Sequence, residues 1–298
     1  THLYDSSNDG YFGMTTAERV SWAIDQIILE HQTKGKVDMV FMPGDICNNK
    51  LIDNVSGTDN DPDGVERLTD FRDNYANRLK AAGIPVFAAH GNHDIYSNNT
   101  WESVFQYTQD PNYIAGYGKN YAVRLNDKVA FVVLDTFDAE DIGFVNNASG
   151  KSWPEKCVGS EIFTPILEAV ADYEEVYLVT HWMDDSSSLY SELADAISGA
   201  PNVIASFVGH KHRETVTTFG SKLLFMCSFV ATPGYEEQST FDEAPWGYRI
   251  LKKDNDKIYS YITYFEKDYP TFTFSNSSGA TVQAFYQPYF RKSATPIK

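Results

Sequence analysis

Four apolar runs in this chain each end in a side chain that can bind a metal ion, and this repetition constrains the fold more than any other feature. In the clearest case, residues 86–94 read Val-Phe-Ala-Ala-His-Gly-Asn-His-Asp. We interpret the apolar part as a buried strand that presents polar side chains at its carboxyl end, where open α/β sheets place their ligand sites. A single cluster of this kind is also compatible with an ordinary loop, so the other three runs decide its meaning.

The other apolar runs end in the same way. The candidate ligands at the four strand ends are Asp45, Asn92 with His93, His181, and His210 with His212. Singly, each has an ordinary explanation: Asp45 suits a turn, His181 suits a packed core, and a pair of histidines suits the two sides of a turn. Together they predict one shared site. Their mixture of nitrogen and carboxylate ligands suits Zn, Mn or Fe better than Ca or Mg.

Helical and strand patterns alternate through the first two thirds of the chain, which favours parallel strands with helices packed against them. The first predicted helix begins at Thr15 or Thr16 and carries His31 on its inner face. Further helices are predicted over residues 64–82, 161–171 and 186–197. Strands are predicted over residues 37–42, 86–90, 120–125, 128–135, 176–180 and 203–208, and hairpins over 215–227 and 248–265. Residues 95–119 read as a long excursion rich in Tyr and Asn.

The chain of 298 residues carries a formal net charge of −17. A surface this acidic repels nucleic-acid backbones and anionic membranes, so we expect neither a nucleic-acid polymer nor a membrane surface as partner. A phosphate substrate stays compatible with this charge if bound metal ions supply local positive charge, although solubility alone is the simplest explanation. No apolar run has the length of a membrane-spanning helix, and the three cysteines show no CxxC spacing.

The chain resembles the calcineurin-like metallophosphoesterases in four short motifs: Gly44-Asp45, Gly91-Asn92-His93-Asp94, His181, and Gly209-His210-Lys211-His212. That family carries Asp-x-His, Gly-Asp, Gly-Asn-His-Asp (or Glu), His and Gly-His-x-His in this order, and the resemblance spans residues 2–212. It implies an α/β fold built as a four-layer αββα sandwich, with two mixed β-sheets flanked by helices. It also implies metal-dependent hydrolysis of a phosphate ester.

The resemblance assigns six side chains to a pair of metal ions, which we expect to be Mn, Fe or Zn. The implied ligands are His2, Asp45 and His212 at the first metal, and Asn92, His181 and His210 at the second, with Asp45 bridging the two. In this arrangement the ions would share a water molecule and lower its pKa, so that a bridging hydroxide attacks phosphorus. They would also neutralise charge that develops on the phosphoryl oxygens.

The third motif of the family pattern, which is Gly91-Asn92-His93-Asp94 in this chain, also supplies two residues implied in catalysis. His93 would face the substrate and protonate the leaving oxygen, a general-acid contribution of about 10²–10⁴-fold. Asp94 would orient His93, as hydrogen-bonded partners of functional histidines do. We expect a small-molecule phosphate ester as substrate, and we favour a phosphodiester.

The sequence departs from the family pattern at its first motif. The family's aspartate would stand two residues before His2, and that position precedes Thr1. We therefore expect the sequence to begin inside this motif, without the strand that normally carries it. We place the catalytic domain at residues 1–269 and a C-terminal tail at 270–298, which adds extra strands in one interpretation and is a disordered end in the other.

Other functions stay open on the sequence. The same fold could serve a phosphomonoesterase acting on a phosphoprotein or a lipid head group, or a degenerate non-catalytic metal-binding module, which only the missing aspartate favours. Several loop aromatics could stack on a base or sugar, or simply pack the loops: Tyr96, Trp101, Tyr113, Tyr117, Trp153 and Trp182. Trp182 is the best candidate for stacking because it follows His181. The sequence makes no prediction of compartment or oligomeric state.

Overall fold

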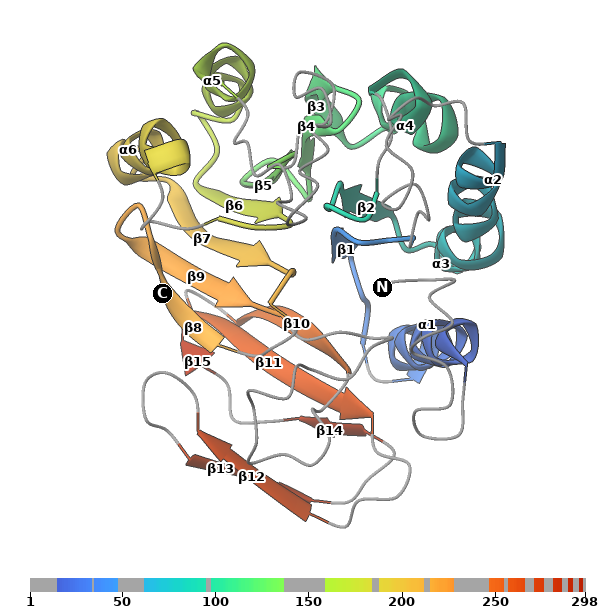
Figure 1. The fold of residues 1–298 in the computed structure, drawn as a ribbon. Helices are drawn as coiled ribbons and strands as arrows, with labels where there is room; N and C mark the ends of the chain where they lie inside the picture. Colours follow the sequence, from blue (N-terminus) through green and yellow to red (C-terminus); the bar gives the residue numbers. More distant parts are fainter. Residues whose placement is uncertain are drawn as a thin grey trace, which may run out of the picture.

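A seven-stranded mixed sheet forms the centre of the protein, as the computed structural model shows (Figure 1). The described residues are 15–33, 35–47, 62–94, 98–136, 159–183, 188–211, 215–227, 247–254, 257–265, 271–275, 281–285, 289–291 and 295–296. The strands of the central sheet are β3 (Tyr113–Tyr117), β4 (Asn120–Arg124), β5 (Val129–Leu134), β6 (Glu175–Thr180), β7 (Val203–Val208), β8 (Thr215–Phe219) and β9 (Lys222–Met226). Their order is β3-β4-β5-β6-β7-β9-β8, with β5, β6, β7 and β9 parallel.

Side chains of the parallel strands alternate between two cores, one on each face of the sheet. The β5 side chains in one core are Val129, Phe131 and Val133, and those in the other are Ala130, Val132 and Leu134. Successive side chains of a strand point to opposite faces, and both faces of this sheet are covered. This is why the strands read in the sequence as continuous apolar runs.

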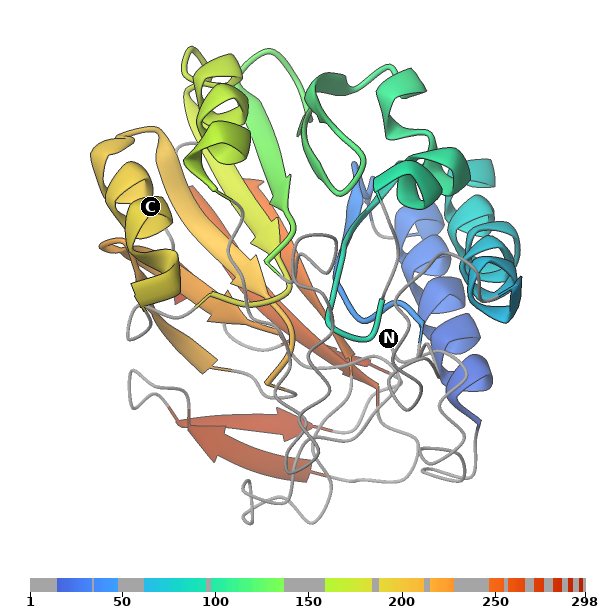
Figure 2. The same cartoon turned by 45° about the horizontal axis from the view of Figure 1, so that its top comes forward.

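The face that carries Ala130, Val132 and Leu134 is covered by α5 (Ser160–Ala169) and α6 (Ser191–Gly199). A 3₁₀ turn, η6 (Ser188–Tyr190), leads into α6. The second face packs against the parallel pair β1 (Val40–Pro43) and β2 (Val86–Ala89). Outside that pair lie α1 (Thr16–Thr33), α2 (Pro62–Phe71) and α3 (Asn77–Ala81). Figure 2 shows these two groups of helices on opposite sides of the strands. The layers are helix, sheet, sheet and helix, which confirms the predicted αββα sandwich.

The predicted helices form, with local differences. Thr15 caps α1, because its backbone N–H donates to Oε2 of Glu18 at 2.7 Å while the Glu18 N–H donates to Oγ1 of Thr15 at 3.2 Å. His31 is fixed at the other end, where its Nδ1 accepts from the N–H of Val37 at 3.0 Å. The predicted helix 64–82 is continuous but contains a π-helical turn, η4 (Arg72–Ala76), between α2 and α3.

The predicted excursion at 95–119 contains elements that the sequence pattern did not reveal. They are α4 (Asn98–Phe105), the 3₁₀ turn η5 (Tyr107–Gln109) and strand β3 at the sheet edge. Trp101 and Tyr107 are buried and belong to the core that includes β2. The hydroxyl of Tyr107 accepts from the N–H of Ala88 at 3.0 Å, so this segment covers β2 at the strand that supplies the third motif.

The C-terminal third adds further strands. They are β10 (Gly247–Asp254), β11 (Lys257–Phe265), β12 (Thr271–Ser275), β13 (Thr281–Phe285), β14 (Tyr289–Arg291) and β15 (Thr295–Pro296). The β10–β11 hairpin forms as predicted, and β14 and β15 both pair with β11. Strands β14 and β15 therefore extend a sheet that begins before residue 270, whereas β12 and β13 pair only with each other among the described strands, and the domain boundary at 269 stays a prediction.

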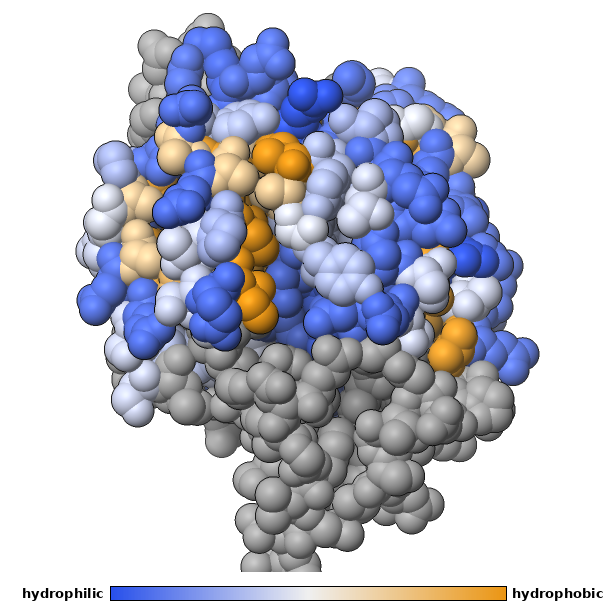
Figure 3. Space-filling model, turned by 90° about the horizontal axis from the view of Figure 1, so that it is seen from above, coloured by the Kyte–Doolittle hydropathy of each residue, from blue (hydrophilic) through white to orange (hydrophobic). Residues whose placement is uncertain are grey.

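The surface carries few large apolar side chains. Leu29 and Tyr117 are the exposed large apolar residues of the part described here. Figure 3 shows one face, which is mainly hydrophilic with apolar residues in small patches. Among the helices the structure describes, none is both long and apolar enough to cross a membrane.

Candidate metal centre

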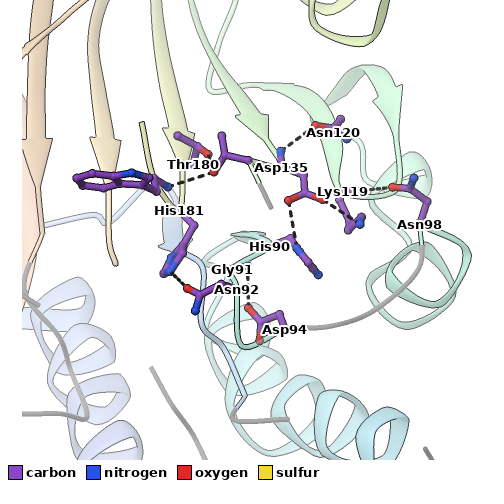
Figure 4. A network of polar contacts seen from close by, with 12 residues as sticks. His90, Gly91, Asn92, Asp94, Asn98, Lys119, Asn120, Asp135, Thr180 and His181 are labelled. Atoms are coloured by element: carbon purple, nitrogen blue, oxygen red, sulfur yellow. Dashed lines mark hydrogen bonds and ion pairs between the residues drawn. The ribbon is translucent and has the colours of Figure 1, made fainter. Parts of the chain in front are cut away.

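The carboxyl ends of four strands bring the predicted ligands together. Asp45 follows β1, Asn92 follows β2, His181 follows β6 and His210 follows β7. Because β1 and β2 run parallel, and β6 and β7 do too, the loops at their carboxyl ends meet at one edge of the sandwich. Figure 4 shows His181 and Asn92 pointing toward one another in this region.

The side-chain atoms of these residues lie at hydrogen-bonding distances. Nε2 of His181 is 3.1 Å from Oδ2 of Asp45 and 3.0 Å from Oδ1 of Asn92. Nδ1 of His210 is 3.0 Å from the same Asn92 oxygen and 3.3 Å from Nε2 of His181. One ligand atom each from Asp45, His181 and His210 lies within 4.8 Å of the other two. Four side chains from separate segments thus surround one small space.

The chemistry of this cluster calls for a cation. Nδ1 of His181 donates to the carbonyl of Pro43 at 2.7 Å, so in the neutral ring Nε2 carries the lone pair. That lone pair faces the oxygens of Asp45 and Asn92, which are also acceptors. The acceptor atoms repel one another unless a positive charge lies among them. Burial lowers the pKa of His181, but the Asp45 carboxylate outweighs burial and holds this pKa above its ordinary value. A proton or a metal ion satisfies the arrangement, and this donor set fits a metal.

The ligand-bearing turns adopt backbone conformations that need particular residues. Asp45 has φ 51° and His210 has φ 62°, which is the left-handed region that non-glycine residues rarely enter. Gly44 has φ 83°, and a Cβ there would lie 2.4 Å from Nδ1 of His181. Only glycine lets the Pro43–Asp45 turn pass this close to the imidazole.

Asp94 connects two of the ligand loops. Its carboxylate accepts backbone N–H groups of Ile46 at 2.9 Å, Cys47 at 2.8 Å and Gly91 at 3.1 Å. Burial and then the neighbouring Asp45 charge raise the pKa of Asp94 to about 7. The described contacts of the Asp94 carboxylate therefore tie the turn after β1 to the turn after β2. Its predicted orientation of His93 stays a prediction.

His93 stands beside the cluster and is partly exposed, whereas Asn92 beneath it is buried. The backbone N–H of His93 donates to Oδ1 of Asp45 at 2.9 Å, which fixes the position of His93 relative to this carboxylate. Burial, and then the neighbouring His181, lower the pKa of His210 to about 3. The His210 ring is therefore neutral at physiological pH, as a metal ligand must be.

A buried polar network, which sequence reasoning missed, lies behind the third motif. Nδ1 of His90 donates to Oδ1 of Asp135 at 3.1 Å, and Nζ of Lys119 lies 2.9 Å from Oδ2 of the same carboxylate. The N–H of Asp135 donates to Asn120 Oδ1 at 2.8 Å (Figure 4). One signal was present, because Asp135 ends the predicted strand 128–135 at the same edge as the ligands.

Two of the aromatic side chains considered for either stacking or packing are buried in the protein. Trp101 is completely buried. Trp182 is 5% exposed, its backbone N–H donates to Oγ1 of Thr136 at 3.2 Å, and its ring centroid lies 5.3 Å from that of His210. Tyr117 is exposed, and its hydroxyl donates to the side-chain oxygen of Asn99. The packing interpretation therefore holds for Trp101 and Trp182.

Other predicted site residues lie outside the described residues. They are the metal candidates His2 and His212 and the aromatic residues Tyr96 and Trp153. The described cluster thus contains Asp45 and the three residues assigned to the second metal. The roles assigned to all these side chains, including His93, stay predictions.

Comparison with known proteins gives one family match. A family model described as calcineurin-like phosphoesterase matches residues 14–214, more than half of the chain. No curated protein sequence matches.

Three solved structures share parts of the architecture. GAP50, the anchor in the inner membrane complex of Plasmodium, is 15% identical with a TM-score of 0.49, covering 83% of this chain and 80% of its own. The sulfate thiohydrolase SoxB of Thermus thermophilus is 11% identical with a TM-score of 0.42, covering 96% of this chain and 43% of its own. A single mutant of Vps29 from Entamoeba histolytica is 13% identical with a TM-score of 0.33, covering 89% of this chain and 91% of its own.

Proposed function

Because this chain belongs to the calcineurin-like phosphoesterase family, we propose that it hydrolyses a small phosphodiester with the help of metal ions held at its strand-end cluster. The observation that carries the proposal is the convergence of acceptor atoms from Asp45, Asn92, His181 and His210. Such a set is unfavourable without a cation, and two of its members are fixed by strained backbone.

In this proposal Asn92, His181 and His210 would hold one metal ion, His2 and His212 would hold the other, and Asp45 would contribute to both. We expect Mn, Fe or Zn from the ligand types. When bound, the metals would activate a water molecule and draw charge from the phosphoryl oxygens. The protein fixes the ligand directions: the Pro43 carbonyl sets the His181 ring, and the N–H of His93 holds the Asp45 carboxylate.

We propose that His93 donates a proton to the leaving oxygen. It is the partly exposed histidine of the third motif, whereas His181 is completely buried. The N–H of His93 is anchored on a proposed ligand of both metals, which keeps the imidazole next to the site of reaction. Asp94 supports this placement by holding the two turns together.

A phosphodiester is the preferred substrate because it carries a single negative charge. The net charge of −17 disfavours highly anionic substrates, and a nucleic-acid polymer most of all. A phosphomonoester from a phosphoprotein or lipid head group is the alternative substrate. A non-catalytic metal-binding module is the alternative outside enzymes.

The experiment measures bound metal per chain and hydrolysis of bis-p-nitrophenyl phosphate against p-nitrophenyl phosphate, with Mn²⁺, Fe²⁺ or Zn²⁺ added. Metal binding with diester preference supports the proposal, monoester preference selects the alternative substrate class, and metal binding without turnover selects the module. Asp45→Ala should lose both metal and activity. His93→Ala should lower kcat by about 10²–10⁴-fold and keep its metal. Asp127→Asn, at an exposed turn, is the control carboxylate variant.

A further inference from the structure

We propose that Lys211, supported on the indole ring of Trp182, is an anion-binding side chain of this site and contacts a phosphoryl oxygen of the substrate. The inference rests on the proposed function and deepens it, because it adds a residue that recognises the phosphate group without binding metal. Lys211 is the variable residue of the Gly-His-x-His motif, so the motif itself assigns it no role.

The position of Lys211 follows from the turn after β7. The N–H of Lys211 donates to the carbonyl of Gly209 at 2.7 Å, and His210 between them has φ 62°. Lys211 therefore lies in a tight turn, directly after the candidate ligand His210. Its Nζ lies 4.5 Å from the centroid of Trp182, the residue that follows His181. The Lys211 side chain therefore reaches from the loop that carries His210 to the loop that carries His181.

Among the residues that the structure describes, no carboxylate forms an ion pair with Lys211. Several other cations of the described chain do stand next to acids, as in Lys36 with Asp38 at 3.1 Å and Lys128 with Glu174 at 2.6 Å. Across the described residues, no carboxylate oxygen lies within the 4.0 Å of an ion pair with Lys211. This is notable in a chain with 41 acidic and 24 basic residues.

The Trp182 ring holds the ammonium without neutralising it. A cation over an indole face gains about 0.5–2 kcal/mol but keeps its full charge. The ring is itself fixed, being 5% exposed and packed at 5.3 Å from the His210 ring. Lys211 is thus a preoriented charge at the rim of the cluster, half-buried rather than free in solvent.

A lysine beside a metal centre is unfavourable unless an anion binds between the positive charges. Lys211 follows His210 directly in the chain, and both side chains lie against the Trp182 ring. A metal ion at His210 would therefore feel repulsion from the ammonium. A phosphoryl group that bridges metal and ammonium removes it, and a charge-assisted hydrogen bond to one phosphoryl oxygen would result.

The test uses the metal-loaded protein and inorganic phosphate as probe, with binding measured by calorimetry beside the kinetics of ester hydrolysis. Lys211→Met keeps the aliphatic stem on the Trp182 ring and removes the charge. We expect it to raise both the phosphate Kd and the substrate KM by about tenfold, with metal content unchanged. Lys211→Arg should restore most of the binding.

Lys222→Met is the matched control. Lys222 is also half-buried, but it begins β9, which runs parallel to β7, so it lies at the opposite edge of the sheet from His210. Its phosphate Kd and KM should equal those of the wild type. An unchanged phosphate Kd in Lys211→Met, or loss of its metal, overturns the inference.

The two proposals fail separately. If the wild type binds phosphate through Lys211 but hydrolyses neither ester, the proposed function is wrong and the anion site stands. If the wild type hydrolyses esters and Lys211→Met behaves like it, only the anion site is wrong. If the wild type neither binds phosphate nor turns over, both are wrong.

Discussion

Lys119 and Asp135 form an ion pair, with 2.9 Å between Nζ and Oδ2, that is almost completely inside the protein, since their side chains are 1% and 0% exposed. The pair joins the turn between β3 and β4 to the end of β5. His90 donates to the other oxygen of the carboxylate at 3.1 Å. Because Gly91 and Asn92 follow His90 directly, this network fixes the start of the loop that carries the third motif.

Removing one charge of this pair should be much worse than removing both. Asp135→Asn keeps an acceptor for His90 but leaves Lys119 charged and buried, so we expect a loss of about 3–5 kcal/mol in the free energy of unfolding. Lys119→Met combined with Asp135→Asn leaves no uncompensated charge and should recover most of this loss. Urea unfolding of the wild type, both single variants and the double variant measures the coupling. Additive losses would show that the charges do not stabilise one another.

The pKa of Asp135 predicts how the stability of the protein depends on pH. Burial alone raises the pKa of Asp135, but His90 and Lys119 outweigh it and hold this pKa well below its usual range. A lowered pKa in the folded state gives stability that is complete above the unfolded value of about 3.9 and is lost as pH falls toward the folded value.

Unfolding free energies measured in urea between about pH 5 and pH 2 test this dependence. The wild type should lose more stability over this window than the variant that combines Lys119→Met with Asp135→Asn, because only the wild type has the Asp135 carboxylate. The other carboxylates titrate in both proteins and cancel in the comparison. Parallel curves for the two proteins would contradict the assignment.

The glycine before Asp45 gives a test with a matched control inside the chain. Gly44 and Gly83 both have φ 83°, but a Cβ on Gly44 would meet Nδ1 of His181 at 2.4 Å, while a Cβ on Gly83 meets nothing within 4 Å. Both alanine variants carry the strain of an L side chain in the left-handed region, about 1–2 kcal/mol. We expect only Gly44→Ala to displace His181 and lower metal affinity, by about tenfold or more. Equal metal affinities, measured by calorimetry with Zn²⁺, would refute this account of the turn.

The sequence predicted the centre of the fold because its strands are buried on both faces. Continuous apolar runs followed by a polar side chain mark β1, β2, β6 and β7, and the parallel topology then brings Asn92, His181 and His210 together. The family match over residues 14–214 confirms the resemblance drawn from the motifs. Short-range patterns were sufficient here because each of the four described candidate ligands follows the end of a strand.

The parts that were missed depend on tertiary contacts. Helix α4 is stabilised by burial of Trp101 and Phe105, and a helix of this length shows little periodicity in the sequence. Lys119 stands in a turn, where a lysine is ordinarily exposed, and only the fold reveals that Asp135 lies next to it. Trp182 was considered for stacking because of its place after His181, whereas Lys211 and His210 cover its ring.

Metal binding should release protons near neutral pH. Without a metal, burial and the Asp45 charge raise the pKa of Asp94 to about 7, and Asp45 holds the pKa of His181 above its ordinary value. A cation in the cluster favours the ionised Asp94 and the neutral His181, so both pKa values fall when it binds. Metal affinity should therefore rise as pH increases through about 7 and level off above it.

Calorimetric titration of the metal-free protein with Zn²⁺, in buffers that differ in ionisation enthalpy, counts the protons released. We expect release at pH 6.5 and less at pH 8.5, where Asp94 has already lost its proton. His31→Gln is the control, because His31 bonds the backbone of Val37 at the end of α1 and lies outside the cluster. The same release at both pH values, or none at pH 6.5, would mean that a metal binds elsewhere than between Asp45 and His181.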